Sequence, residues 1–130
     1  METKNLNQTV VFKASPNEVY EALMDSEKHA KFTGDKAEIS RDVGGKVSAY
    51  GGFIEGENLE LVQDKKIIQK WRGSDWPEGV YSKVIFILEK MPEGAKLIFT
   101  HESIPSQFFE DIKQGWEDFY WKPMRKFLEK

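Results

Sequence analysis

The sequence SQFFEDIKQGWEDFYWKPMRKFLEK, residues 106–130, predicts one long helix at the end of the chain. Its acidic residues come first and its basic residues last, an order that complements the helix dipole. Ser106, which follows Pro105, is the expected N-cap. A continuous helix of this length would span about 37 Å, at about 1.5 Å per residue. Pro123 removes one backbone hydrogen bond inside the helix, so we expect a kink there.

One wide face of this helix is apolar when its residues are placed at about 100° per residue. The residues on that face are Phe108, Phe109, Ile112, Trp116, Phe119, Tyr120 and Phe127. A face of this width has to be buried against a sheet, and we expect the apolar residues from Phe109 to Tyr120 to be its buried side. Trp121 falls on the opposite side, beside Leu128. Two interpretations stay open for Trp121: an exposed contact for a partner, or a core residue in a stripe that the kink has shifted.

Between residues 36 and 102 the apolar residues alternate with period two, which is typical of half-buried strands. After a first strand at 6–13, we expect strands at 36–41, 46–50, 53–62, 66–73, 80–90 and 95–102. Short loops join them, so consecutive strands should pair antiparallel. Gly44-Gly45 and Gly51-Gly52 suit tight turns with positive φ. Gly56, inside a strand, predicts a bulge or a bend.

Two short helices are predicted directly after the first strand. Ser15, Pro16 and Glu18 form a capping box with proline in the first helical position, which satisfies backbone donors at a helix start. The second helix is expected at 26–32 and should stop at Gly34. This order of elements predicts an α+β fold, a curved antiparallel sheet of six to seven strands wrapped around the long C-terminal helix. We expect residues 1–130 to form a single domain.

The composition predicts a soluble, cytoplasmic protein. The chain has 130 residues, of which 39% are hydrophobic and 32% charged, as in an ordinary globular domain. It holds no cysteine, so disulfides, thiol nucleophiles and sulfur-ligated metals are excluded. Its net charge of −3 comes from interspersed signs, which argues against a nucleic-acid partner. Because no apolar run reaches bilayer length and residues 1–8 are polar, we expect neither membrane insertion nor secretion.

The sequence shows no recognisable catalytic apparatus. The acid pairs Glu110-Asp111 and Glu117-Asp118 complement the helix dipole and should face solvent rather than act in acid–base chemistry. A nucleophile–base set and a phosphate-binding glycine loop are both missing. His29 and His101 have no carboxylate at metal-ligand spacing, and His29 should lie on the surface. We therefore expect a non-catalytic protein without cofactor or metal.

Strand alternation gathers apolar side chains on the face that meets the C-terminal helix. The expected ligand-binding residues are Gln69, Trp71, Phe86, Phe99, His101, Trp116 and Tyr120. Apolar walls with few polar anchors, here Gln69 and His101, are typical of a small-molecule site. The leading hypothesis is a binding domain that takes an apolar small molecule or peptide between sheet and helix. The alternative is that the same residues form a solid core, with His101 bonded to a neighbour.

Several short motifs occur in order along nearly the whole chain. They are Phe12 with Ala14-Ser15-Pro16, Val19-Tyr20, Gly44-Gly45-Lys46, Gly56 with Leu61-Val62, Lys70-Trp71-Arg72, Trp76-Pro77-Glu78-Gly79, Ile104-Pro105, and Gln114-Gly115-Trp116 with Tyr120. In these motifs the chain resembles the C-terminal domain of the activators of heat-shock protein 90 ATPase, a branch of the START-like (Bet v 1-like, helix-grip) superfamily. The resemblance implies a helix-grip fold.

The resemblance also implies an alternative function, a co-chaperone module that binds the heat-shock protein 90 chaperone and modulates its ATPase. Eukaryotic activators carry a further N-terminal domain that grips the chaperone; we expect none here, because the first strand already begins at residue 6. Contact would come from surface residues that the motifs share. The expected partner-binding residues are Lys70, Arg72, Trp76 and Trp121, since outward bases and exposed aromatic rings suit a docking patch. Lys70 and Arg72 could instead merely keep a strand face soluble.

Overall fold

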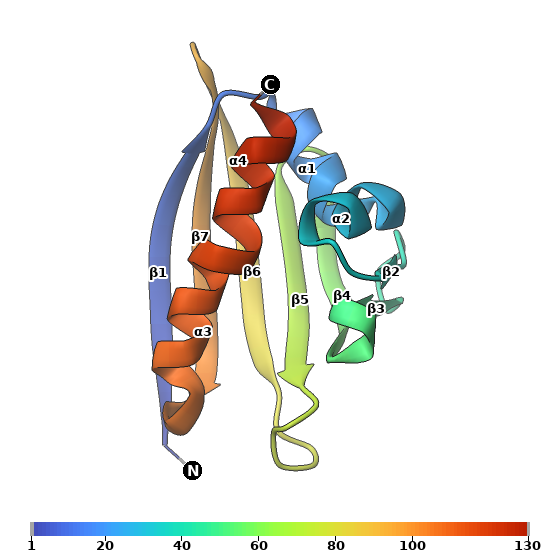
Figure 1. Cartoon of the computed structure of the whole chain (residues 1–130), viewed down its shortest axis with the longest axis vertical. Helices are drawn as coiled ribbons and strands as arrows, with labels where there is room; N and C mark the ends of the chain where they lie inside the picture. The colour runs from blue at the N-terminus through green and yellow to red at the C-terminus, as the bar shows by residue number, and fades with distance from the viewer. Residues whose placement is uncertain (1, 130) are drawn as a thin grey trace.

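The computed structural model describes residues 2–129, which contain one sheet of seven strands (Figure 1). The strands are β1 (Thr3–Phe12), β2 (Glu38–Ile39), β3 (Lys46–Ala49), β4 (Ile54–Val62), β5 (Lys66–Gly73), β6 (Ser82–Met91) and β7 (Gly94–Pro105). Their order across the sheet is β1-β7-β6-β5-β4-β3-β2. Every neighbouring pair is antiparallel, as predicted from the short loops.

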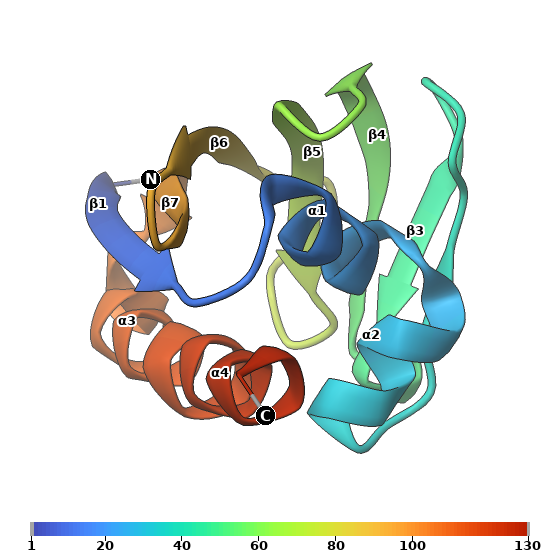
Figure 2. The same ribbon diagram turned by 90° about the horizontal axis from the view of Figure 1, so that it is seen from above.

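The helices lie on one side of this sheet. After β1 come α1 (Pro16–Met24) and α2 (Ser26–Thr33), and the chain ends in four consecutive helical segments. These segments are η2 (Ser106–Phe108), α3 (Phe109–Gly115), the π-helical η3 (Trp116–Trp121) and α4 (Lys122–Leu128), together called the C-terminal helix below. Figure 2 shows the sheet curving over α1 and the C-terminal helix. The predicted α+β helix-grip fold is therefore confirmed.

Local signals placed the start of α1 correctly. The Ser15 hydroxyl accepts from the Glu18 backbone N–H, and the Glu18 carboxylate accepts from the Ser15 N–H, both at 3.1 Å. The predicted N-cap at Ser106 is wrong. There β7 runs on through Pro105, a 3₁₀ turn follows, and the buried Ser106 hydroxyl caps nothing. The predicted strand at 36–41 is reduced to Glu38–Ile39.

Gly56 allows a close approach between β4 and β5. A Cβ atom at this position would lie 1.8 Å from the carbonyl oxygen of Lys70. The register of the two strands then shifts between Asn58 and Glu60. The predicted irregularity of this strand is present, as a bulge just beyond Gly56.

The C-terminal helix departs from α-helical geometry ahead of Pro123. Residues Trp116–Trp121 form a π-helical stretch, and the Lys122 N–H bonds to the Glu117 carbonyl, five residues back. Each residue of such a stretch turns less around the axis than in an α-helix. Trp121 therefore rotates into the core, where its side chain is 1% exposed, and Phe119 rotates out, to 57% exposed.

This rotation corrects two predictions. Phe119 does not belong to the buried side of the helix, and the partner-contact interpretation of Trp121 is wrong, because Trp121 is a core residue. The alternative interpretation, a core residue in a shifted apolar stripe, was right that Trp121 is buried. The stripe is shifted by the π-helical stretch ahead of Pro123, and the helix continues through Pro123 as α4.

The core lies between the concave face of the sheet and the C-terminal helix, and aromatic rings dominate it. Trp116 lies at its centre, with ring centroids 4.4 Å from Phe99, 5.1 Å from Trp71 and 5.3 Å from Trp121. The Trp121 indole also donates to the Gln8 side chain of β1 at 2.8 Å. No helix within residues 2–129 has the length and apolarity needed to cross a bilayer.

Candidate functional site

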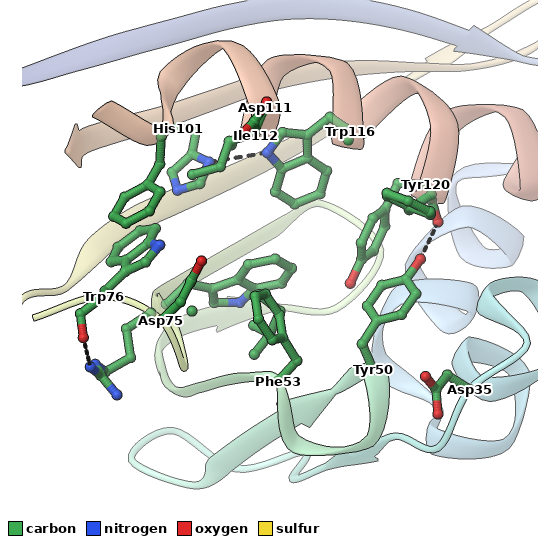
Figure 3. Close-up of a pocket in the computed structure, with 17 residues that line it drawn as sticks. Asp35, Tyr50, Phe53, Asp75, Trp76, His101, Asp111, Ile112, Trp116 and Tyr120 are labelled. Carbon is green, nitrogen blue, oxygen red and sulfur yellow. Dashed lines mark hydrogen bonds between the residues drawn. The ribbon is translucent and has the colours of Figure 1, made fainter. Parts of the chain in front are cut away.

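A cavity of about 470 Å³ opens between the C-terminal helix, the end of β5 and the η1 turn (Tyr50–Gly52) (Figure 3). Its lining residues are Asp35, Tyr50, Phe53, Ile54, Trp71, Arg72, Gly73, Asp75, Trp76, His101, Phe108, Asp111, Ile112, Gly115, Trp116, Phe119 and Tyr120. The volume lies within the range of small-molecule sites. Apolar and aromatic side chains supply most of the wall.

The structure divides the predicted ligand-binding residues into two groups. Trp71, His101, Trp116 and Tyr120 line the cavity. Gln69, Phe86 and Phe99 lie deeper, around a space of about 10 Å³ or packed against Trp116. Such a space holds at most about one water molecule. The solid-core interpretation is thus right for the deeper group, and the open volume lies nearer to η1 and the loop after β5.

His101 anchors the wall of the cavity through a directional chain of hydrogen bonds. The Trp116 indole N–H donates to His101 Nδ1 at 3.1 Å, so this nitrogen carries no proton. The Ser82 hydroxyl donates to the Trp71 carbonyl at 3.0 Å and therefore accepts from His101 Nε2–H at 2.7 Å. Burial lowers the pKa of His101 to about 3. The imidazole is neutral and both of its nitrogens are occupied, so it has no proton to exchange with a ligand.

The side-chain amide of Gln69 is also hydrogen-bonded to neighbouring side chains through both its oxygen and its nitrogen. Its carbonyl accepts from the Trp71 indole N–H at 2.8 Å, and its amide donates to Asn58 at 2.9 Å. Asn58 in turn donates to the carbonyls of Ser40 and Asp42, which ties the turn before β3 to the core. The two polar groups predicted as ligand anchors therefore fix the indoles of Trp71 and Trp116. Asn58 was missed, because its sequence context is that of any polar residue on a half-exposed strand.

The prediction that His29 lies on the surface is wrong. Its side chain is 3% exposed, because α2 packs against the C-terminal helix. Nδ1 donates to the Leu23 carbonyl at 3.2 Å, and Nε2 accepts from the Tyr120 hydroxyl at 3.0 Å. Burial lowers the pKa of His29 to about 4 and raises the pKa of Tyr120. A short, polar α2 sequence gave no sign of this contact.

Among the predicted partner-binding residues, Trp76 is also buried, at 8% exposed, and stacks on Phe108 with ring planes 10° apart. Its exposure was expected because the surrounding loop is polar. The aromatic side chains that face solvent are others, namely Phe53, Tyr81 and Phe119. Phe53 and Phe119 line the cavity and are exposed at its mouth.

Of the predicted partner-binding residues, Lys70 reaches solvent most. The Lys70 ammonium lies 3.7 Å from Glu57 and 4.7 Å above the Tyr81 ring. Arg72 is mostly buried: its guanidinium donates to the carbonyls of Trp76 and Pro77 and lies 3.6 Å from Glu55. Arg72 therefore holds the loop after β5 that forms one wall of the cavity.

Tyr50 links the η1 turn to the C-terminal helix across the cavity. Its hydroxyl donates to the Phe119 carbonyl at 2.6 Å. In an α-helix this carbonyl would accept from residue 123, but Pro123 has no N–H to donate. Tyr50 holds a left-handed backbone, with φ 53°, which is unfavourable for a non-glycine residue. Burial and the nearby Asp35 carboxylate raise the pKa of Tyr50, so it remains a donor at neutral pH.

Three carboxylates surround the cavity, from separate parts of the chain: Asp35 after α2, Asp75 in the loop after β5, and Asp111 in α3 (Figure 3). Within residues 2–129 none of the three forms an ion pair. The same part of the chain holds no cluster of three or more side chains suited to a metal. The sequence indicated Asp111 only as a solvent-facing helix residue and did not single out Asp35 or Asp75, because only the fold brings the three acids to one cavity.

A family model for "Activator of Hsp90 ATPase homolog 1-like protein" matches residues 13–129. The chain belongs to this family. Human "Activator of 90 kDa heat shock protein ATPase homolog 1" is 30% identical over 115 residues, and a Dictyostelium discoideum homologue is 34% identical over 118 residues. Each alignment covers 88% of this chain but only 34% and 30% of the relative. The chain thus spans about a third of the length of these curated relatives.

Solved structures agree with the family assignment. An HSP90 activator from Plasmodium falciparum is 30% identical, covers 91% of each chain and superposes with a TM-score of 0.85. A Chromobacterium violaceum protein is 26% identical, covers 97% of each chain and has a TM-score of 0.80. The human and Dictyostelium discoideum relatives are described as activators of the 90 kDa heat shock protein ATPase, and the Plasmodium falciparum protein as an HSP90 activator.

Proposed function

We propose that this domain binds a heat-shock protein 90 chaperone in the cytoplasm and modulates its ATPase. The observation that carries the proposal is the family membership over residues 13–129, together with a Plasmodium falciparum HSP90 activator that matches over nearly its whole chain. The buried polar groups fit a non-catalytic role. The hydrogen bonds of His101 and Gln69 are made to neighbouring side chains.

The outer face of β5 supplies a docking patch for the chaperone. Lys70 presents a cation beside the exposed ring of Tyr81, and interfaces favour aromatic side chains next to charges that steer association. The patch lies on the face of the sheet turned away from the core, since Trp71, the next residue, points inward. This patch keeps Lys70 from the predicted partner-binding residues and adds Tyr81, whereas Trp76 and Trp121 are buried and drop out.

The test is a titration of this domain into the chaperone of the same organism, following ATP hydrolysis and the heat of binding. We expect a change in hydrolysis rate and a Lys70→Glu variant that binds a few-fold more weakly, since a rim charge contributes about 0.2–1 kcal/mol. Lys31→Glu, at an exposed position of α2, is the matched control and should bind as the parent does. Folded protein that changes neither signal would refute the proposal.

The cavity supports a second function, the binding of an apolar small molecule between the sheet and the C-terminal helix. About 470 Å³ of space with aromatic walls and a fixed polar floor is the kind of site that such ligands use. The neutral fluorophore N-phenyl-1-naphthylamine should bind there and brighten. Ile112→Trp should block it by filling the cavity, whereas Gln114→Trp, on the exposed side of the same helix, should not. Equal binding by both variants would count against the cavity as the site.

A further inference from the structure

Among residues 2–129, the charged lining residues without an ion-pair partner all carry negative charge. Asp35, Asp75 and Asp111 approach it from three sides, and each side chain is exposed and free of ion pairs within residues 2–129. The one base among the described lining residues is Arg72. Its guanidinium donates to two backbone carbonyls and lies 3.6 Å from Glu55, so its charge is already paired, although its buried Nε has no hydrogen-bond partner in the described part of the chain.

The aromatic wall also favours a positive charge. Trp71 and Trp116, which stack on each other with planes 23° apart, line the cavity together with Tyr50 and Phe53, so aromatic rings form much of its wall. Figure 3 shows the rings of Tyr50, Phe53 and Trp116 around it. Aromatic faces carry negative electrostatic potential and attract ammonium groups within about 6 Å of the ring. Asp35 lies beside the η1 turn, which carries Tyr50. A Cβ atom built on Gly51 of this turn would lie 3.2 Å from Asp35 Oδ1.

The floor of the cavity does not oppose a cation. His101 would be the one further source of positive charge there, but Trp116 and Ser82 occupy its ring nitrogens in the neutral form. An anionic ligand would meet three carboxylates without a free base, and a neutral ligand would make no use of them. The carboxylates, the aromatic wall and the neutral floor together favour a positively charged ligand.

We propose that the cavity binds a small organic cation, an ammonium group carried on an apolar or aromatic body. The body lies against the aromatic wall and the ammonium group lies toward the carboxylates of Asp35, Asp75 and Asp111. This inference rests on the second proposed function, ligand binding in the cavity, and adds the chemical class of the ligand.

Three matched probes test the proposal: 3-phenylpropylammonium, neutral 3-phenylpropan-1-ol and anionic 3-phenylpropanoate, each followed by tryptophan fluorescence and calorimetry. At low salt we expect the cation to bind roughly tenfold more tightly than the alcohol, and the anion most weakly. The preference for the cation should shrink at 0.5 M salt, because salt screens exposed carboxylates, whereas binding of the alcohol should persist.

Variants test whether the three carboxylates cause the preference for the cation over the alcohol. The triple variant Asp35→Asn, Asp75→Asn, Asp111→Asn should bind cation and alcohol about equally, whereas Glu110→Gln, next to Asp111 but outside the cavity, should keep the parent's preference. If the parent binds alcohol and cation equally, the charge selection is wrong and the apolar-ligand function stands. If folded parent binds none of the three probes, both are wrong.

Discussion

Hydrogen bonds of single residues hold the rings that form the cavity wall. The indole N–H groups of Trp71 and Trp116 each donate to a buried acceptor, Gln69 and His101 respectively. A buried donor without a partner costs about 1–3 kcal/mol, so these bonds restrict where the rings can sit. The wall of the cavity is therefore preorganised before any ligand arrives.

Trp116→Ala should destabilise the protein by ~3–5 kcal/mol, the range for removing a large buried aromatic side chain. Trp116 is packed among other core rings, and its loss also leaves His101 Nδ1 without a donor. Urea unfolding at pH 7 measures the change. Phe119→Ala, at a residue 57% exposed on the same helix, is the control and should cost less than about 1 kcal/mol. A similar small loss for both variants would mean that Trp116 is not a core residue.

The two buried histidines predict how stability depends on pH. Their folded pKa values, about 3 for His101 and about 4 for His29, lie below the unfolded value of about 6.5. Between these values the unfolded chain binds more protons, so stability is full above pH 6.5 and falls as the pH is lowered. Each histidine should remove about 2 kcal/mol between pH 7 and pH 5.

Urea unfolding at several pH values between 7 and 5 measures this slope. His101→Gln should remove about half of it, whatever the variant's stability at pH 7, and His29→Gln should remove the other half. The reference pKa values of aspartate and glutamate side chains, about 4, lie outside this window. An unchanged slope in both variants would contradict the assignment.

At the scale of elements, the sequence predicts features that depend on a few consecutive residues. It does not predict how far each residue turns around the axis of the C-terminal helix. The capping box of α1 and the alternation of β5 are properties of a few consecutive residues, and both were read correctly. The helix face was placed at a constant rotation per residue, so the π-helical stretch Trp116–Trp121 could not be foreseen and Phe119 and Trp121 exchanged sides.

The candidate site was predictable to a similar extent. Trp71, His101 and Trp116 follow from strand and helix periodicity and line the cavity as expected. Asp35 and Asp75 lie in turns, where no period relates them to the strands, and only the folded chain brings them to one cavity. Trp76 is likewise buried by stacking on Phe108, which is distant in the sequence, so the sequence of the loop alone does not predict its burial.

The bond from Tyr50 to the C-terminal helix can be tested through Pro123. Tyr50→Phe removes a donor to the Phe119 carbonyl and should cost about 0.5–1.5 kcal/mol. Pro123→Ala restores a backbone N–H near this carbonyl, so the cost of Tyr50→Phe should be smaller in the Pro123→Ala background. A double-mutant cycle of urea unfolding measures the coupling, and strictly additive losses would show that the tyrosine does not replace the missing donor.

At the scale of the whole molecule, the sheet separates the two proposed functions. Trp71 of β5 faces the cavity, whereas the adjacent Lys70 faces away from the core and pairs with Glu57. Because successive strand residues point to opposite faces, one strand supplies both a cavity wall and the docking patch. A chaperone on the outer face need not touch a ligand under the C-terminal helix.

This separation predicts opposite effects from two variants. Ile112→Trp should abolish binding of the neutral fluorophore and leave the ATPase response to this domain unchanged, because it fills the cavity without altering the outer face. Lys70→Glu should weaken the chaperone response a few-fold and leave fluorophore binding unchanged, since Lys70 does not line the cavity. Thermal unfolding of both variants confirms that each is folded. If Ile112→Trp also removes the ATPase response, the chaperone docks at the mouth of the cavity, where Phe53 and Phe119 are exposed, and the two functions share one surface.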